Sequence, residues 1–193
     1  MTDDLARRLA PALAPWFLTR DGSRDLGRGS AFPSTDVPGG VTVGDRFFRT
    51  DLFLPCVYTS AGWLTTFEIP LAFGAGGNTY ATNYSATTAS VRLASTRNDH
   101  QLYLTYATMT ISTGATNNGS NYITYNFVDS TGATVWSVST AADGTNATLT
   151  KASASFTQPN AATSFIRLDI AVTGAPSAQF LYTPVLYARM IIT

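Results

Sequence analysis

Apolar residues recur at helical spacing near the start of the sequence. Between residues 3 and 18 they stand three or four positions apart, which is the spacing of one apolar helix face. Pro11 and Pro15 interrupt this period, so we expect a short or kinked helix within residues 1–18. Such a helix is marginal alone in water and needs a surface to dock on, either its own domain or a partner protein. If it is an arm that binds a partner, the contact residues are Leu5, Leu9, Leu13, Trp16 and Phe17.

Glycine and proline replace this period over residues 19–43. The residues that break regular structure there are Gly22, Gly27, Gly29, Pro33, Pro38, Gly39 and Gly40. This composition is typical of a flexible connection between folded parts. We therefore predict that residues 19–43 are a linker, which separates the arm from the rest of the molecule and lets it reach a neighbouring subunit.

Alternating residue types then predict a β-hairpin module over residues 44–64. Because strand side chains alternate between faces, Arg46 and Phe48 should lie on one face, with Phe47 and Arg49 on the other. The chain should reverse over the next three residues, return as a second strand and turn again before a tryptophan. We interpret the module as a joint between the arm and the rest of the molecule, with its charges in internal ion pairs and turn caps. The joint residues are Asp45, Arg46, Phe47, Phe48, Arg49, Asp51 and Trp63.

Residues 65–193 form a series of strand-like runs separated by turns. Tyr122–Val128 alternates between two faces, and Asn117-Asn118-Gly119-Ser120 just before it is a strong turn signal. Around eight such runs, without a βαβ pattern or a helical period, predict an all-β fold, an antiparallel jelly-roll-like β-sandwich. Pro184 inside the last run requires an edge position, a bulge or a change of sheet.

Composition narrows the choice of function. Charged residues make up only 12% of the chain and the formal net charge is zero, so nothing favours binding to nucleic acid or to an acidic membrane. No apolar run is long enough to cross a bilayer, which argues against membrane insertion. The acidic first residues and the prolines that follow do not resemble a signal peptide, so we expect a protein that is made and used without export.

Candidate catalytic residues are scarce. His100 is the only histidine and lies in a polar, turn-like stretch, Glu68 is the only glutamate, and Cys56 is the only cysteine and lies within an apolar strand. These residues offer no pair for acid–base or nucleophilic catalysis, and no metal-binding or phosphate-binding motif occurs. We therefore predict a protein that is not an enzyme, with no catalytic, cofactor-binding or metal-binding residues and no cofactor.

The loops suggest one kind of ligand, a glycan. Aromatic rings can stack on the apolar side of a sugar while side-chain amides bind its hydroxyl groups. The alternative, which we favour, is that the tyrosines fill the ends of the sandwich and the asparagines shape turns. The possible glycan contacts are Tyr80, Asn83, Tyr84, Asn117 and Asn118.

The predicted hairpin module resembles part of the tailed-bacteriophage virion structural proteins. The matching residues are Phe32-Pro33-Ser34, Gly44-Asp45-Arg46-Phe47-Phe48-Arg49-Thr50-Asp51-Leu52, Tyr58 and Gly62-Trp63-Leu64. Two short segments depart from the family pattern: Cys56-Val57-Tyr58 replaces an aromatic pair, and Thr59-Ser60-Ala61 replaces an Asp-Gly-Thr turn. In that family a β-sandwich often follows the module.

The resemblance implies a structural component of the virion, of the head-decoration, head-fibre or tail-fibre type. Such a protein would be assembled in the host cytoplasm and displayed on the virion surface, where it contacts the host. Its partners would be other virion proteins of the capsid or tail, bound through the N-terminal arm, and the three-fold and six-fold sites of virions make a homotrimer the expected state. Two alternatives remain, a glycan-binding receptor-binding module and a self-assembling surface or filament protein.

Overall fold

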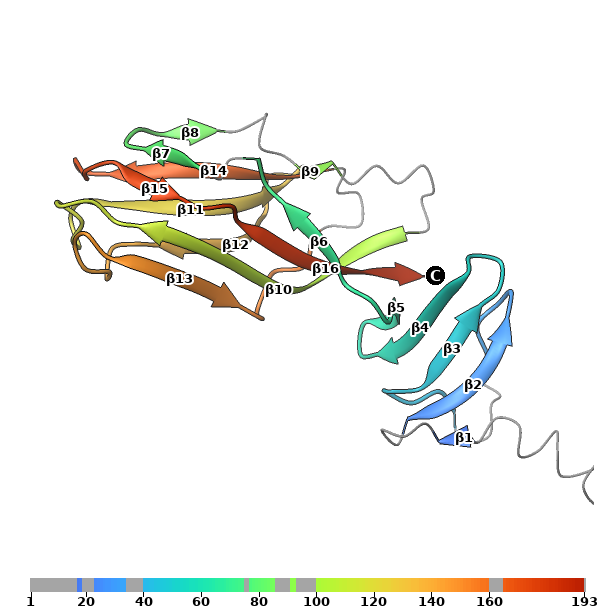
Figure 1. The fold of residues 1–193 in the computed structure, drawn as a ribbon. Helices are drawn as coiled ribbons and strands as arrows, with labels where there is room; N and C mark the ends of the chain where they lie inside the picture. Colours follow the sequence, from blue (N-terminus) through green and yellow to red (C-terminus); the bar gives the residue numbers. More distant parts are fainter. Residues whose placement is uncertain are drawn as a thin grey trace, which may run out of the picture. The chain divides into compact units, whose positions relative to one another are not determined.

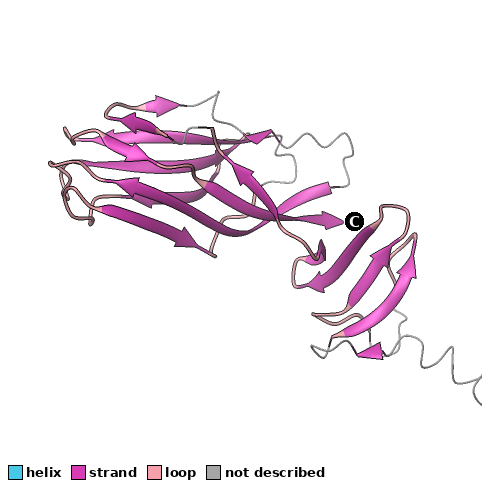
Figure 2. Cartoon of the chain, viewed as in Figure 1, coloured by secondary structure: helices cyan, strands magenta, loops and turns pink. Residues whose placement is uncertain are grey.

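The computed structural model of the chain describes residues 17–18, 23–33, 40–74, 77–85, 91–92, 100–159 and 165–192. This part of the chain consists of strands, turns and loops and contains no helix (Figure 2). It belongs to two compact units. Unit 1 comprises Met1–Phe67 and Met190–Thr193, and unit 2 comprises Glu68–Arg189.

Unit 1 is built on a small β-sheet (Figure 1). Its strands, in their order across the sheet, are β1 (Phe17–Leu18), β2 (Arg24–Gly29), β3 (Arg46–Arg49), β4 (Leu54–Thr59) and β5 (Gly62–Thr65). Neighbouring strands are antiparallel except β2 and β3, which are parallel. The hairpin predicted within residues 44–64 is present and continues into a third strand, so this module is a three-stranded meander.

Two predictions for the segment before the meander need correction. The predicted helical arm lies largely outside the described residues, but its end, Phe17–Leu18, is strand β1. Strand β2 lies inside the predicted linker of residues 19–43, and its Arg28 pairs with Phe48 of β3. The glycines that suggested a linker have another role, since Gly27 has a φ of 87° beside a register shift in β2. Glycine in a strand often marks such an irregularity.

Unit 1 has its own hydrophobic core. Phe47, Cys56, Trp63 and Ile192 are each at most 8% exposed, and Phe32 stacks on Trp63 with ring centroids 4.7 Å apart. The burial pattern of β3 alternates, so Phe47 and Arg49 face inward while Arg46 and Phe48 are exposed, as the alternation predicts. The module therefore folds around an aromatic cluster that is separate from the core of the sandwich.

Burial should make the Cys56 thiol unreactive in the folded protein. Cys56 is 1% exposed, and burial raises the pKa of its thiol to about 11. At pH 8 we expect a disulfide reagent to modify native Cys56 at least about a hundred-fold more slowly than a free thiol of ordinary pKa. The same protein unfolded in guanidinium chloride is the control, because its only thiol then becomes accessible. Rapid labelling under native conditions would contradict the buried position.

Unit 2 is a sandwich of two antiparallel sheets (Figure 1). The first sheet has the order β16-β10-β15-β7, with β6 beside β16 and β13 beside β10; the second has the order β12-β11-β14-β8, with β9 beside β14. The strands of the first sheet are β6 (Ile69–Ala72), β7 (Asn78–Tyr80), β10 (His100–Ser112), β13 (Thr148–Ser153), β15 (Gln179–Leu181) and β16 (Val185–Ile192). The strands of the second are β8 (Tyr84–Ser85), β9 (Val91–Arg92), β11 (Tyr122–Asp129), β12 (Thr134–Ser139) and β14 (Phe165–Thr173).

The core of unit 2 lies between these two sheets. Each sheet contributes the inward residues of its alternating strands, and the central ones are at most 2% exposed. They are Leu104, Met109, Ile111, Leu181 and Leu186 from the first sheet, and Ile123, Tyr125, Phe127, Ile166, Leu168 and Ile170 from the second. The prediction of an all-β antiparallel sandwich is confirmed.

The boundaries of the sandwich differ from the predicted range of 65–193. Unit 2 begins at Glu68, and residues 190–193 return to unit 1. The reason is that strand β16 serves both units: its first part pairs with β6, and its Ile191 pairs with Leu64 of β5. Pro184 lies before β16, outside the strands, where its carbonyl accepts a hydrogen bond from the Phe73 N–H.

Candidate functional site

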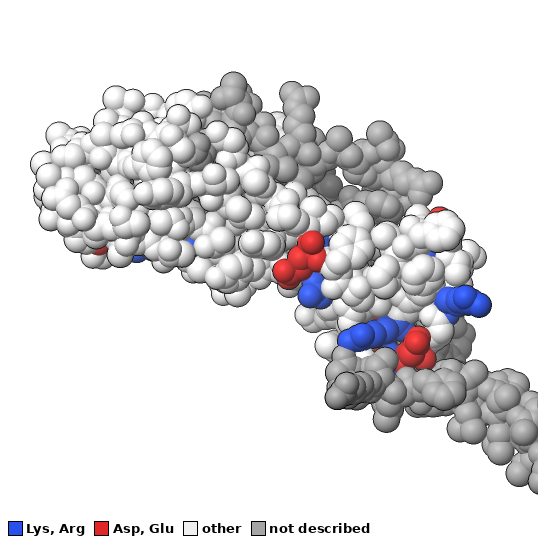
Figure 3. Space-filling model, viewed as in Figure 1, with Lys and Arg blue, Asp and Glu red and all other residues white. Residues whose placement is uncertain are grey.

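Unit 1 carries a dense group of charges, whereas the face of unit 2 seen in Figure 3 is almost free of them. The charged residues that the structure describes in unit 1 are Arg24, Asp25, Arg28, Asp45, Arg46, Arg49 and Asp51. All lie on the first three strands of its sheet or in the turns that follow them. Unit 1 is therefore the first candidate for a functional site.

Asp45 and Arg24 form a buried ion pair. Arg24 Nε donates to Asp45 Oδ1 over 2.8 Å, Arg24 Nη2 contacts Asp45 Oδ2, and the Thr42 N–H donates to Asp45 Oδ2 over 2.7 Å. The side chains are 2% and 14% exposed. Burial alone would raise the pKa of Asp45, but the hydrogen bonds from Arg24 and Thr42 outweigh it and the pKa is lowered. The pair holds β2 against the turn before β3, so it stabilises the module.

Arg49 and Asp51 form a second pair, at the turn after β3. Two parallel hydrogen bonds of 2.9 Å join the guanidinium to the carboxylate, and the Arg49 guanidinium lies 4.6 Å from the centre of the Phe32 ring. The Arg49 hydrogen bond lowers the pKa of the exposed Asp51 carboxyl. Of the charged joint residues, Asp45, Arg49 and Asp51 lie in ion pairs as predicted, although Asp45 pairs with Arg24, a residue outside the predicted module.

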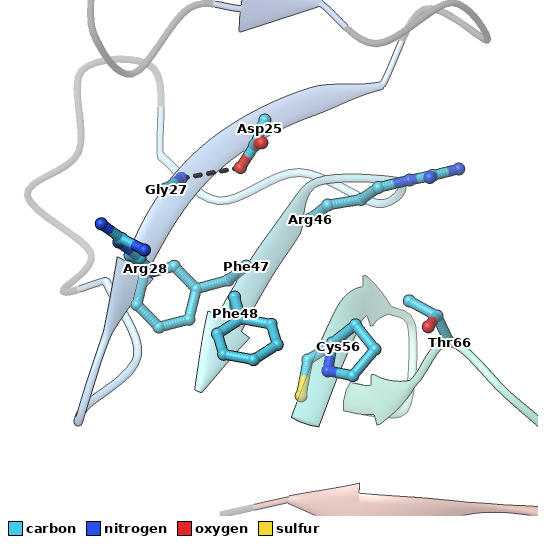
Figure 4. A pocket seen from close by; sticks show the side chains of 9 residues that line it. Asp25, Gly27, Arg28, Arg46, Phe47, Phe48, Cys56 and Thr66 are labelled. Atoms are coloured by element: carbon cyan, nitrogen blue, oxygen red, sulfur yellow. Dashed lines mark hydrogen bonds between the residues drawn. The ribbon is translucent and has the colours of Figure 1, made fainter. Parts of the chain in front are cut away.

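The outer face of the sheet of unit 1 has a different character. A shallow groove of about 460 Å³ runs across it, and Figure 4 shows the exposed Phe48 near its middle, with Arg28 on one side and Arg46 on the other. The groove is lined by Asp25, Gly27, Arg28, Arg46, Phe47, Phe48, Pro55, Cys56 and Thr66. A face that combines guanidinium groups with an exposed aromatic ring is suited to contacts with another polypeptide.

Phe53, in the turn between β3 and β4, is the most exposed large apolar side chain of the described residues, at 80%. Its φ of 54° is in the left-handed region, which a bulky side chain rarely adopts. An exposed phenylalanine in that conformation contributes little to the core of unit 1.

The residues predicted as glycan contacts have mainly internal roles. Asn117 is 2% exposed and donates from Nδ2 to the carbonyl oxygens of Thr140 and Asp143, over 2.8 and 2.7 Å. Its Oδ1 accepts from Thr140 Oγ1 at 3.0 Å and from Gln179 Nε2 at 2.9 Å. The Tyr125 hydroxyl donates to Gln179 Oε1 over 3.4 Å. Asn117 therefore belongs to a buried polar network and lies out of reach of a glycan.

The other four predicted contacts lie near turns and strand ends. Asn118 accepts from the N–H groups of the turn that follows it, and Asn83 Oδ1 accepts the Val172 N–H over 2.7 Å. Tyr80 is buried in the core of unit 2, with its ring 5.4 Å from the ring of Tyr84, which is 36% exposed. Asn83, Tyr84 and Asn118 are exposed, but the buried Asn117 and Tyr80 exclude a site made by all five residues.

The sequence does not predict the contacts or the exposure of three residues of unit 1, Arg24, Arg28 and Phe53. Arg24 and Arg28 lie in the predicted linker, and their partners Asp45 and Phe48 lie about twenty residues further along the chain. Phe53 could have been noticed in the sequence, because it is a large apolar residue in a predicted turn. The alternation of residue types in strands does not predict the exposure of a turn residue.

No group of three or more His, Cys, Asp or Glu side chains suited to a metal ion occurs among the described residues. The same part of the chain forms no helix that is both long and apolar enough to span a membrane.

Comparison with known proteins gives no family. No family model matches the chain, and no curated protein matches it. Several solved structures of infectious bursal disease virus are similar to part of this chain. The viral particle matches with a TM-score of 0.36 and 11% sequence identity, over 63% of this chain and 31% of the viral one. The VP2 subviral particle has a TM-score of 0.35 and 11% identity, over 70% of this chain and 42% of the viral one, and the derived T=1 particles have a TM-score of 0.34 and 14% identity, over 83% and 40%. The chain spans less than half the length of these structures. The likeness carries no conclusion about function, and the class of the protein, an all-β sandwich with a β-meander module, rests on its own strands.

Proposed function

We propose that the protein is a non-enzymatic structural component of a tailed-bacteriophage virion. In this proposal the segment before β1 attaches it to other virion proteins, and the sandwich of unit 2 is displayed on the particle surface as part of a head decoration, a head fibre or a tail fibre. The expected assembly is a homotrimer.

The observation that carries the proposal is the resemblance of residues 44–64 to the virion module. This stretch is the meander of unit 1, and its aromatic residues Phe47 and Trp63 pack in a core of their own. A module with its own core can be combined with different outward domains. Support also comes from the face of the sandwich seen in Figure 3, which carries few charged side chains, because a protein that assembles in many copies must avoid repulsion between like charges.

Deleting residues 1–16 tests the attachment. We expect the shortened protein to keep both units folded, because the deletion ends before β1, and to disappear from purified particles. The measurement is quantitative mass spectrometry of particles from infected cells, with circular dichroism of the purified variant.

Two substitutions refine this test. Leu9→Asp changes an apolar position of the predicted arm and should reduce incorporation, whereas Arg8→Gln changes its polar neighbour and should leave incorporation normal. Normal incorporation of the deletion variant would refute attachment through the arm, and absence of the wild-type protein from the particles would refute the virion assignment itself.

A further inference from the structure

We propose that the outer face of the sheet of unit 1 is a docking surface for a polypeptide segment of a partner protein, one that carries carboxylates beside an apolar side chain. The surface consists of Arg28, Arg46, Phe48 and Pro55 on β2–β4, and the turn between β3 and β4 carries the exposed Phe53. This goes beyond the proposed attachment through residues 1–16 and does not depend on it.

The strand register assembles this surface from three strands. Arg28 of β2 pairs with Phe48 of β3, and Phe48 pairs with Pro55 of β4. Arg46 lies two residues before Phe48 and therefore on the same face. The register thus places one arginine, one phenylalanine and one proline side by side on three strands, with a second arginine beside them. Figure 4 shows Phe48 between Arg28 and Arg46.

The apolar part of the surface has no role in the core of unit 1. Phe48 is 37% exposed and Phe53 is 80% exposed, while the inward positions of the same strands fill the core. The left-handed backbone of Phe53 adds a second, independent observation, because glycine would fit there without strain. A strained residue that exposes an aromatic ring is better explained by contact with a partner than by stability.

The charged side chains of the surface indicate which kind of partner can bind. Arg28 is exposed and forms no ion pair within the described part of the chain, so its planar guanidinium group is available for a carboxylate. The groove also contains Asp25, which accepts the Gly27 N–H and would repel a polyanion such as nucleic acid. A second copy docking through the same face would place guanidinium groups opposite guanidinium groups. A short acidic segment with an apolar side chain satisfies these conditions.

A peptide titration tests the surface with the full-length protein. The probe is fluorescein-labelled Gly-Asp-Leu-Asp-Leu-Gly, the control probe has asparagine in place of both aspartates, and binding is followed by fluorescence anisotropy up to about 2 mM peptide. We expect saturable binding of the acidic peptide, weakened at least about tenfold by Arg28→Gln and by Phe48→Thr. Arg167→Gln, which removes an arginine from unit 2, is the matched control and should bind like the wild type.

Phe53→Gly separates a binding role from a structural one. Because glycine adopts the left-handed backbone freely, this variant should melt at the same or a higher temperature while binding the acidic peptide more weakly. Absent binding, equal binding of the two peptides, or unchanged binding by Arg28→Gln and Phe53→Gly would each overturn the proposal. Self-association that is lost in Phe53→Gly would assign the surface to a second copy instead. None of these results depends on incorporation into particles.

Discussion

Replacing Asp45 with alanine is expected to lower the free energy of unfolding of unit 1 by about 3–5 kcal/mol. The loss is large because Asp45 is only 2% exposed, so water cannot take the place of the carboxylate that accepts hydrogen bonds from Arg24. It also removes the acceptor of the Thr42 N–H, so the turn before β3 loses an internal hydrogen bond. Urea unfolding followed by tryptophan fluorescence in a Trp136→Phe background measures this, because the remaining tryptophans belong to unit 1.

Asp51→Ala is the matched control. It removes a carboxylate from an arginine in the same unit, but Asp51 is 38% exposed and water can replace it. We expect a much smaller loss for this variant. Equal losses for Asp45→Ala and Asp51→Ala would show that the buried pair is no more important than the exposed one.

Asp45 should also make unit 1 sensitive to acid. Because the pKa of Asp45 is lowered in the folded protein, the stability it contributes is fully present above its unfolded pKa of about 3.9 and is lost as the pH falls through the folded value. The wild type should therefore lose more stability than Asp45→Ala when the pH falls from about 5 to about 3. Parallel pH profiles of the two proteins would contradict the lowered pKa.

Replacing Asn117 with alanine is expected to lower the stability of unit 2 by about 3–5 kcal/mol. The substitution removes four hydrogen bonds to Thr140, Asp143 and Gln179, each worth about 1 kcal/mol. The Thr140 and Gln179 groups keep other partners in the network. Hydrogen exchange of peptides from β11 and β14 reports the opening of the sandwich. Protection there should fall by at least about a hundred-fold.

Asn118→Ala provides the comparison, since this neighbour is exposed and caps only its own turn. Its expected cost is about 1 kcal/mol or less. Gln179→Ala should approach the cost of Asn117→Ala, and the double variant should cost less than the sum, because both residues act in one network. Additive losses would show that the network is not a unit.

The buried faces of strands could be predicted from the sequence, because they depend on the local alternation of apolar and polar residues. In β11 the alternation separates Ile123, Tyr125 and Phe127 from their polar neighbours, and all three are fully buried. The faces of β3 were predicted for the same reason. A period of two identifies the buried face wherever one face of a strand meets a core.

Pairings between distant segments could not be predicted in this way. The parallel contact of β2 with β3 joins residues about twenty positions apart, and the glycines of β2 favoured a linker. Asn117 was found as part of a turn, but its burial depends on Thr140 and Gln179, which no local signal connects to it. Of the candidate surface of unit 1, the sequence therefore predicts only that Arg46 and Phe48 lie on one face.

The shared strand β16 has a consequence for the order of synthesis. Ile192 fills part of the core beside Trp63, and the Met190 N–H donates to Thr65 Oγ1 over 3.2 Å. Unit 1 therefore contains residues that leave the ribosome before unit 2 and residues that leave after it. Although its first strands are made early, its core is complete only when all of unit 2 has been translated. A chain released before residue 190 would therefore carry an unfinished module.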